Sequence, residues 1–352
     1  MEDEYLQFYI LSYFDLKKVT TVSQIIHVFH AKRTPSMFYL VEVNGWHHGF
    51  SLTNKMTREQ LSRSVRYLAE NSYLIEKEKG YILTNKGYQS CREYFESHRY
   101  PQNIKSFANA KIRVPFWDRY QLFTQVFSEY SYQNIKYIPI VKHPLHQENV
   151  RQLFHQFNSN KEQLLKQWCT EQRLLLEQMD GQLADALVNQ LTGHESIGKT
   201  RAQLADDYQM TSWEFVFYFM DAIEEMIQFI QKNKDELLLN REILKVLHQE
   251  TYLGLSASTF NTYKLLKKGL SLSEIAIQRS IKINTVREHI LEMAFTFEKF
   301  PYQRFVPSRI YKSLRHGFDE VENFSYQYAA NEINQLEFMH YRLVELERLR
   351  LK

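Results

Sequence analysis

The chain has 352 residues, of which 44% are hydrophobic, 14% aromatic and 24% charged. The chain is longer than one ordinary domain, so several modules are expected. Its hydrophobic content excludes general disorder. Only ten glycines and seven prolines interrupt the chain, which disfavours a many-stranded sheet and predicts a mainly α fold. The net charge of +3 does not by itself identify a nucleic-acid binder.

Neither the N-terminus nor the cysteines indicate export. The chain opens with Glu2, Asp3 and Glu4, unlike the basic start of a signal peptide. No apolar run approaches the roughly 20 residues that cross a bilayer. Cys91 and Cys169 fit no zinc or redox spacing and are expected to be buried free thiols. A cytoplasmic protein without a membrane segment is therefore expected.

The N-terminal sequence predicts a winged-helix-like unit. Apolar residues recur at helical spacing in Val22–Phe29, and a capping box at Thr57 opens a second amphipathic helix. Two short β-prone runs follow, 73–76 and 81–84, and then another helix. Between the two amphipathic helices we expect a long irregular insertion over 34–56.

Composition and periodicity divide the chain into three predicted modules. These are a winged-helix-like domain over 1–100, a helical connector or interaction region over 101–250, and a helix-turn-helix domain over 251–352. The middle region is expected to contain four or five helices between Gln147 and Leu247, whose Leu and Phe stripes are typical of core or partner-docking faces. The last module is expected to end with a capping or partner-binding helix over Asn331–Leu349.

The pattern over Thr259–Ala294 is that of a helix-turn-helix. Its first helix ends at Gly269, because glycine accepts the left-handed conformation cheaply. Ser271 and Glu274 form a capping box for the second helix, and Asn284 is expected to cap the third. Five apolar residues of these helices are predicted to face inward: Ile275, Ala276, Val286, Ile290 and Met293.

The solvent side of the third helix is the candidate recognition face, because a helix presented in this way can enter the major groove. Asn284, Thr285 and Arg287 suit base edges, whereas Glu288 would repel phosphate or accept a hydrogen bond from cytosine. Four further cations are expected on phosphates: Lys282, Arg279, Lys267 and Lys268.

Positive charge is concentrated around this motif. Ser256–His316 holds eleven Lys and Arg against four Glu, a local +7 that leaves the rest of the chain at −4. This excess favours DNA as the partner, with protein docking as the alternative for a trihelical unit.

Two runs in this region carry a family resemblance. Thr262–Ala276, continued by Asn284–Ile290, resembles the helix-turn-helix domain appended to many RecQ-type helicases. It also resembles the C-terminal domain of the bacterial YpbB family, whose members are encoded beside a RecQ-type helicase. The Thr285-Val286-Arg287 element followed by His289 is similar to the recognition helix of LuxR-type regulators as well. The resemblance implies an accessory protein that works with a RecQ-type helicase in DNA repair or replication; a transcription regulator is the alternative.

A second motif, Gly193–Thr200, matches the P-loop pattern G-x-x-x-x-G-K-[ST]. A working P-loop follows a buried strand and opens a helix. Residues 183–191 have helical periodicity instead, and Phe215–Asp221, the apparent source of a second acid, lies on a helical stripe. Thr200 also fits a helix cap with Gln203. We interpret the match as textual, and P-loop nucleotide binding is the lesser alternative.

Other catalytic and metal signals are weak. The sequence contains no G-x-S-x-G or H-E-x-x-H motif, so a non-enzymatic protein without a cofactor is expected. Four histidines (His27, His30, His47 and His48) lack a Cys or carboxylate to complete a tetrahedral site, so no metal is expected. The sequence leaves open the preferred DNA structure, the oligomeric state and whether the N-terminal unit touches DNA.

Overall fold

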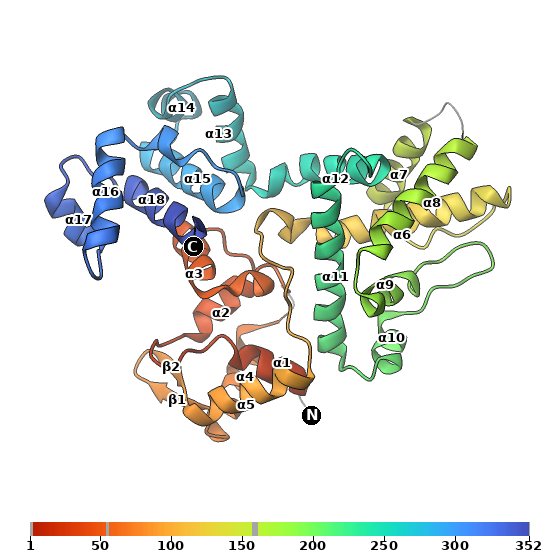
Figure 1. The fold of residues 1–352 in the computed structure, drawn as a ribbon, viewed down its shortest axis with the longest axis horizontal. Coiled ribbons are helices and arrows are strands. Elements are labelled where there is room, and N and C mark those ends of the chain that lie inside the picture. Colours follow the sequence, from red (N-terminus) through yellow and green to blue (C-terminus); the bar gives the residue numbers. More distant parts are fainter. Residues whose placement is uncertain (1–2, 54–55, 157–160, 352) are drawn as a thin grey trace. The chain divides into compact units, whose positions relative to one another are not determined.

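The computed structural model describes residues 3–53, 56–156 and 161–351 (Figure 1). Within these ranges, eighteen α-helices and one two-stranded antiparallel sheet confirm the mainly α prediction. They form two compact units: a larger unit of residues 1–30, 48–105 and 109–251, and a C-terminal unit of residues 31–47, 106–108 and 252–352. A segment from the first fifty residues therefore belongs to the C-terminal unit, and the three consecutive modules stay a prediction.

The start of the larger unit has the element order of a winged helix. Helices α1 (Glu4–Leu11), α2 (Val22–Phe29) and α4 (Arg58–Glu70) precede the hairpin of β1 (Leu74–Lys77) and β2 (Gly80–Leu83), and α5 (Asn85–Ser97) follows. Thr20 extends the sheet by an isolated antiparallel bridge to Tyr81. The capping box at Thr57 forms as predicted, with Gln60 as the reciprocal partner. The predicted order of helices and hairpin is confirmed.

The expectation of an irregular insertion over 34–56 was wrong for most of its length. It contains helix α3 (Pro35–Asn44) and a 3-10 turn, η1 (Trp46–Gly49), while residues 54–55 lie outside the described residues. Thr34 caps α3, Pro35 occupies its first turn, and Gly45 ends it in the left-handed conformation at φ 67°. These signals were present in the sequence, but ten residues give too short an apolar stripe to reveal a helix by periodicity.

Helix α3 packs within the C-terminal unit. Phe38 is fully buried, and its ring lies 4.9 Å from that of Phe107 and 5.7 Å from that of Phe295. Val41, one turn later, is also fully buried. The contact between Phe38 and Phe295 joins residues more than 250 positions apart, so the sequence pattern alone did not predict it.

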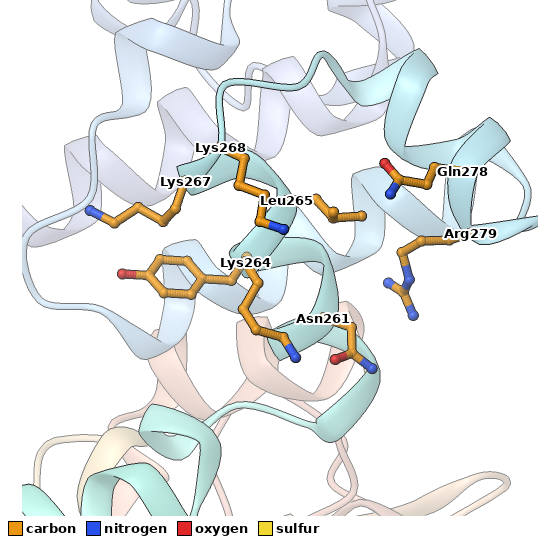
Figure 2. Close-up of a pocket in the computed structure, with 8 residues that line it drawn as sticks. Asn261, Lys264, Leu265, Lys267, Lys268, Gln278 and Arg279 are labelled. Atoms are coloured by element: carbon orange, nitrogen blue, oxygen red, sulfur yellow. The ribbon is translucent and has the colours of Figure 1, made fainter.

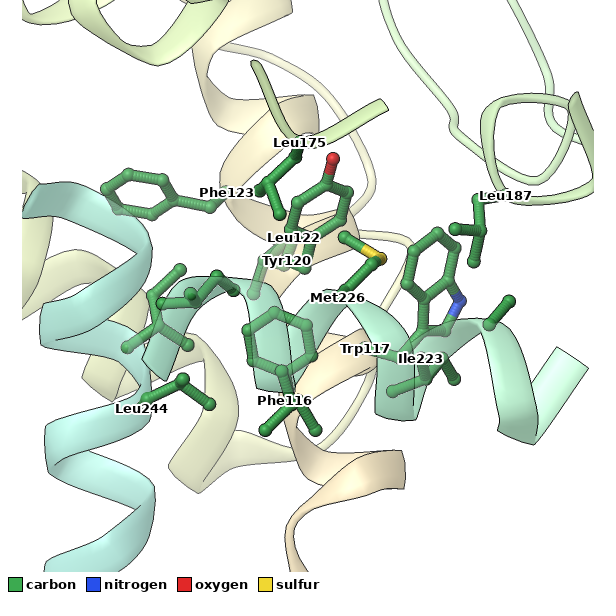
Figure 3. Packing of buried hydrophobic residues seen from close by; sticks show 14 of the residues in the cluster. Phe116, Trp117, Tyr120, Leu122, Phe123, Leu175, Leu187, Ile223, Met226 and Leu244 are labelled. Atoms are coloured by element: carbon green, nitrogen blue, oxygen red, sulfur yellow. The ribbon is translucent and has the colours of Figure 1, made fainter. Parts of the chain in front are cut away.

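The remainder of the larger unit is helical and packs around α11 (Ser212–Lys232). Figure 3 shows Phe116, Trp117 and Tyr120 packed with Ile223 and Met226 of α11, all of them buried. Between residues 144 and 250 the described part of the chain forms six helices rather than the four or five expected. The helices beside α11 are α6 (Arg113–Ser131), α8 (Lys161–Glu177), α9 (Gly181–Val188), α10 (Arg201–Asp207) and α12 (Leu238–Glu250), while α7 (Pro144–Gln156) packs on α6 and α12; a 3-10 turn, η2 (Ala108–Lys111), precedes α6.

The C-terminal unit is built around α15 (Ile283–Thr296), which contacts α3, α13, α14 and α18. Every residue of α15 from His289 to Thr296 is buried. The other elements are η3 (Tyr252–Gly254), α13 (Ala257–Lys267), α14 (Leu272–Arg279), η4 (Tyr302–Phe305), α16 (Ser308–Glu320), α17 (Tyr326–Glu332) and α18 (Phe338–Leu351).

The C-terminal helix differs from the prediction in extent and in role. The expected continuous helix over Asn331–Leu349 is interrupted, because α17 ends at Glu332 and α18 starts only at Phe338. Leu343 and Leu346 of α18 are fully buried against the unit. Of the two roles expected for this stripe, packing on its own domain is therefore the one observed.

Among the helices that the structure describes, none combines the length and apolarity that a membrane span requires. Both cysteines are free, as expected. Cys91 is partly buried, which raises the pKa of its thiol to about 11, whereas Cys169 is exposed. The expectation of burial was wrong for Cys169, which follows the buried Trp168 on the outward side of α8.

Candidate nucleic-acid interface

The predicted helix-turn-helix is formed by α13, α14 and α15. Gly269 ends the first helix region at φ 89°, and the backbone N–H of Ser271 donates to Glu274 Oε2 at 2.7 Å in the predicted capping box. Ile275 and Ala276 of α14 and Val286, Ile290 and Met293 of α15 are buried, as predicted. Local pattern therefore predicted both the three helices and their inward faces.

The start of α15 differs from the prediction in one detail. Lys282 is the N-cap residue and makes no side-chain cap, so Asn284 lies inside the first turn instead of capping it. Its Oδ1 atom accepts a hydrogen bond from Arg287 Nη1 at 2.7 Å. The predicted cap, Asn284, lies two residues after the observed N-cap, because Ile283 already has helical geometry.

Four of the predicted contact residues lie together at this end of α15. Lys282 and Asn284 are exposed, and Thr285 and Arg287 are half-buried. Arg287 Nη2 forms an ion pair with Glu337 at the start of α18. Since α15 is buried from His289 onward, only this first part of the helix is accessible to a ligand.

Arg279 lies elsewhere, on α14, where its partly exposed side chain bonds to α13. Its guanidinium donates to the backbone carbonyl of Ser258 at 2.8 Å, to Ser258 Oγ at 3.0 Å and to Thr262 Oγ1. His289 lies beside it, and burial together with the Arg279 charge lowers the pKa of that imidazole. Arg279 thus connects α14 to α13 by hydrogen bonds.

Lys267 and Lys268 belong to a separate surface at the end of α13, where they line an open hollow of about 530 Å³. Figure 2 shows Lys264, Lys267 and Lys268 on α13, with Gln278 and Arg279 of α14 facing the hollow from its other side. The remaining lining residues are Asn261, Tyr263 and Leu265.

Lys264, Gln278 and Tyr263, which also line this hollow, were not among the predicted contact residues. The spacing of Lys264, Lys267 and Lys268 was a usable signal, because residues three and four apart share one side of a helix. The predicted contact residues therefore form two groups, one at the start of α15 and one, with Arg279 of α14, around the hollow beside α13.

The P-loop-like run does not have the setting of a nucleotide site. It follows helix α9 rather than a strand, and Gly193 and Ser196 close a tight turn through an isolated bridge. Lys199 Nζ pairs with Asp207 at 2.8 Å, and Thr200 caps α10 with Gln203. Asp221, the apparent second acid, lies in the middle of α11 and accepts backbone hydrogen bonds at 2.7–3.1 Å.

We expect Lys199→Ala to leave nucleotide affinity unchanged, because the lysine amine is occupied by an exposed ion pair and no phosphate cradle precedes it. Stability should change by less than about 1 kcal/mol. Calorimetric titration of the full chain with magnesium and ATP checks this expectation. Lys245→Ala, which removes an exposed lysine amine that pairs with Glu242, is the control. Micromolar ATP binding that disappears only in Lys199→Ala would restore the P-loop interpretation.

The histidines considered as metal ligands have protein partners. His30 Nε2 lies 2.8 Å from the Met56 carbonyl, and His47 Nε2 lies 3.2 Å from Glu42. His48 sits between the hydroxyls of Tyr9 and Tyr100, at 2.6 and 2.8 Å. Over residues 3–53, 56–156 and 161–351, no group of three or more His, Cys, Asp or Glu could hold a metal ion.

Comparisons with known proteins agree with this geometry. A family model described as a helix-turn-helix domain matches residues 258–345, which run from α13 into α18. Protein YpbB of Bacillus subtilis (strain 168) is 23% identical over 337 residues, which cover 93% of this chain and 92% of that protein. No solved structure matches the chain. The chain thus carries a helix-turn-helix domain and is similar to YpbB along almost its whole length.

Proposed function

We propose that this chain is a non-catalytic, cytoplasmic DNA-binding protein of the YpbB family that works with a RecQ-type helicase in DNA repair or replication. The observation that carries the proposal is a helix-turn-helix set within a segment of net charge +7, on a chain whose remainder is −4. Such an excess of cations at one module is what phosphate binding requires.

The accessible end of α15 supports DNA as the ligand. Lys282 and Asn284 are exposed there, and Thr285 and Arg287 are partly accessible. These side chains offer a cation and hydrogen-bonding groups of the kinds that contact phosphates and base edges. The short length of the accessible end suits binding to DNA structure better than extended reading of a sequence.

The helicase partnership rests on resemblance. Thr262–Ala276 and Asn284–Ile290 resemble the domain that many RecQ-type helicases carry at their C-terminus, and the similarity to YpbB extends over 93% of the chain. We infer that the accessory protein supplies a DNA-binding module to the motor. A transcription regulator, the alternative, would bind a duplex half-site with high sequence preference.

Replacing Lys282 and Arg287 together by Ala is expected to weaken binding to a forked DNA. If each contacts one phosphate of a duplex arm, the negative slope of log affinity against log salt should become shallower by about 2. Fluorescence anisotropy over a range of salt concentrations measures this slope. Lys232→Ala with Lys234→Ala, which removes the same charge from exposed positions of the larger unit, is the control. An unchanged slope in the α15 variant would exclude this end of the helix as the contact.

The proposal as a whole is tested on the full chain. Anisotropy with fork, single-stranded and random duplex DNA should show binding that weakens steeply with salt. Affinity purification of the tagged chain should retain the RecQ-type helicase of the same organism after nuclease treatment. Absence of binding to every DNA would refute the DNA-binding proposal, and loss of the helicase from the purified complex would refute the partnership.

A further inference from the structure

One side of α13 carries two aromatic rings followed by three lysines. Phe260 and Tyr263 are half-buried, and their rings lie 6.1 Å apart at 24° to each other. Lys264 Nζ lies 5.3 Å from the centre of the Phe260 ring, and Lys267 Nζ lies 5.9 Å from that of Tyr263. Together with Lys268, these residues share one side of the helix, and we call this surface the α13 face.

Neighbouring residues extend the row of rings. Tyr252, which is 42% exposed, has its ring centre 5.4 Å from that of Phe260. On the other side, Phe297 meets Tyr263 edge-on at 5.5 Å. Four aromatic residues therefore contact one another in a row, and the two central ones, which belong to α13, lie beside a lysine amine.

The lysines of the α13 face are available for a ligand. Within the described residues, Lys264, Lys267 and Lys268 are exposed and form no ion pair with a carboxylate. The sequence from Thr251 to Ser273 contains no Asp or Glu, so α13 itself carries no acidic side chain, and Glu292, which contacts its start, is paired with Arg33. The hollow of about 530 Å³ beside these lysines, with Asn261 and Gln278 at its wall, gives room for a phosphate or a base.

We infer that the α13 face binds single-stranded nucleic acid. The inference deepens the proposed function and rests on it, since it names the form of nucleic acid and the surface that holds it. An unpaired base exposes its π-face and can stack on Phe260 or Tyr263, whereas the bases of a duplex are already stacked within it. The three lysines can contact the phosphates of the strand whatever its base sequence. This chemistry is common to DNA and RNA single strands.

The test measures anisotropy of the full chain with labelled oligo-dT and oligo-rU of about 20 nucleotides, and with a duplex, over a range of salt. A single strand of at least one kind should bind more tightly than the duplex. The triple variant Lys264→Ala, Lys267→Ala and Lys268→Ala should lose roughly 10- to 100-fold in single-strand affinity. Its negative salt slope should become shallower by about 2, since each single-strand phosphate contact contributes about 0.7. Its matched control removes three exposed lysines of the larger unit: Lys166, Lys232 and Lys234.

Tyr263→Leu separates stacking from charge. It should weaken single-strand binding by roughly 5- to 100-fold and leave the salt slope unchanged. Tyr328→Leu, at a 48% exposed tyrosine of α17, is the control, and thermal melting reports whether each variant stays folded. Tighter binding to duplex than to either single strand would overturn the inference, as would an α13 triple variant that behaves like its control. In both cases the proposed DNA binding stands, whereas an unmodified chain that binds no nucleic acid would overturn both proposals.

Discussion

Glu292→Gln is expected to lower the free energy of unfolding of the C-terminal unit by about 3–5 kcal/mol, because it removes one partner of a buried ion pair. Arg33 Nε donates to Glu292 Oε1 at 2.9 Å, and the side chains of the two residues are only 13% and 8% exposed. The same carboxylate accepts hydrogen bonds from the Ser256 backbone at 2.7 Å and from Thr259 Oγ1 at 2.5 Å. It thereby joins α15 to the start of α13 and to the residues just before α3.

Neutral Gln cannot satisfy all of these donors. Its amide nitrogen would face an N–H or O–H group that now donates to a carboxylate oxygen, and Arg33 would keep a buried charge without its counter-ion. Burial acts to raise the pKa of Glu292, but the charge of Arg33 and the hydrogen bonds from Thr259 and Ser256 hold that pKa below its usual range. The carboxylate is therefore ionised near neutral pH and its loss is costly.

Hydrogen exchange followed by mass spectrometry is the measurement that separates the two units. In Glu292→Gln, peptides from α3, α13 and α15 should exchange faster, while peptides from α11 should keep their protection. Glu288→Gln, at an exposed position of the same helix, should change stability by no more than about 0.5 kcal/mol. Faster exchange confined to α15, with α3 unaffected, would show that α3 does not share the stability of the C-terminal unit.

Local signals predicted the helix-turn-helix well. Ser271 with Glu274, Thr57 with Gln60 and Thr200 with Gln203 all form the capping boxes that their spacing suggests. Such boxes need only residues three apart, and buried stripes need only the 3.6-residue period, so both can be read from one segment. The helical rather than strand character before the P-loop-like run was predicted for the same reason.

Long-range partners could not be predicted in this way. Arg287 suited a base contact by its place on α15, but Glu337, fifty residues later, pairs with it. Arg279 suited a phosphate contact, but its hydrogen bonds go to Ser258 and Thr262 of α13. The α13 face was only partly identified because Phe260 and Tyr263 have the spacing of core residues, and periodicity does not show how far a ring is covered.

A second long-range contact should make the C-terminal unit sensitive to acid. Glu42 of α3 accepts hydrogen bonds from Arg350 Nε at 2.8 Å and from His47 Nε2 at 3.2 Å. Arg350 also donates to the carbonyls of Ala294 at 2.8 Å and Phe295 at 2.7 Å, near the end of α15. Burial acts to raise the pKa of Glu42, but the His47 and Arg350 interactions outweigh it and lower the pKa from 4.5 to about 2.

A carboxyl group whose pKa is lower in the folded protein stabilises the fold above its unfolded pKa and ceases to do so as the pH falls through its folded pKa. The lowering of the Glu42 pKa from 4.5 to about 2 corresponds to roughly 3 kcal/mol of stabilisation. This stabilisation is present at neutral pH and is lost progressively between pH 4.5 and about 2. We therefore expect Glu42→Gln to destabilise the C-terminal unit by roughly this amount at about pH 7, and by much less at about pH 3.

The difference between Glu42→Gln and the unmodified chain isolates this contribution, because other carboxyl groups titrate equally in both proteins. Urea unfolding at several pH values gives the difference, and hydrogen exchange in α3 and α18 assigns it to the C-terminal unit. Glu320→Gln, at an exposed position of α16, should show a small difference at every pH. A Glu42→Gln penalty that stays constant down to about pH 2 would mean that this carboxylate does not hold α3 against α18 by its charge.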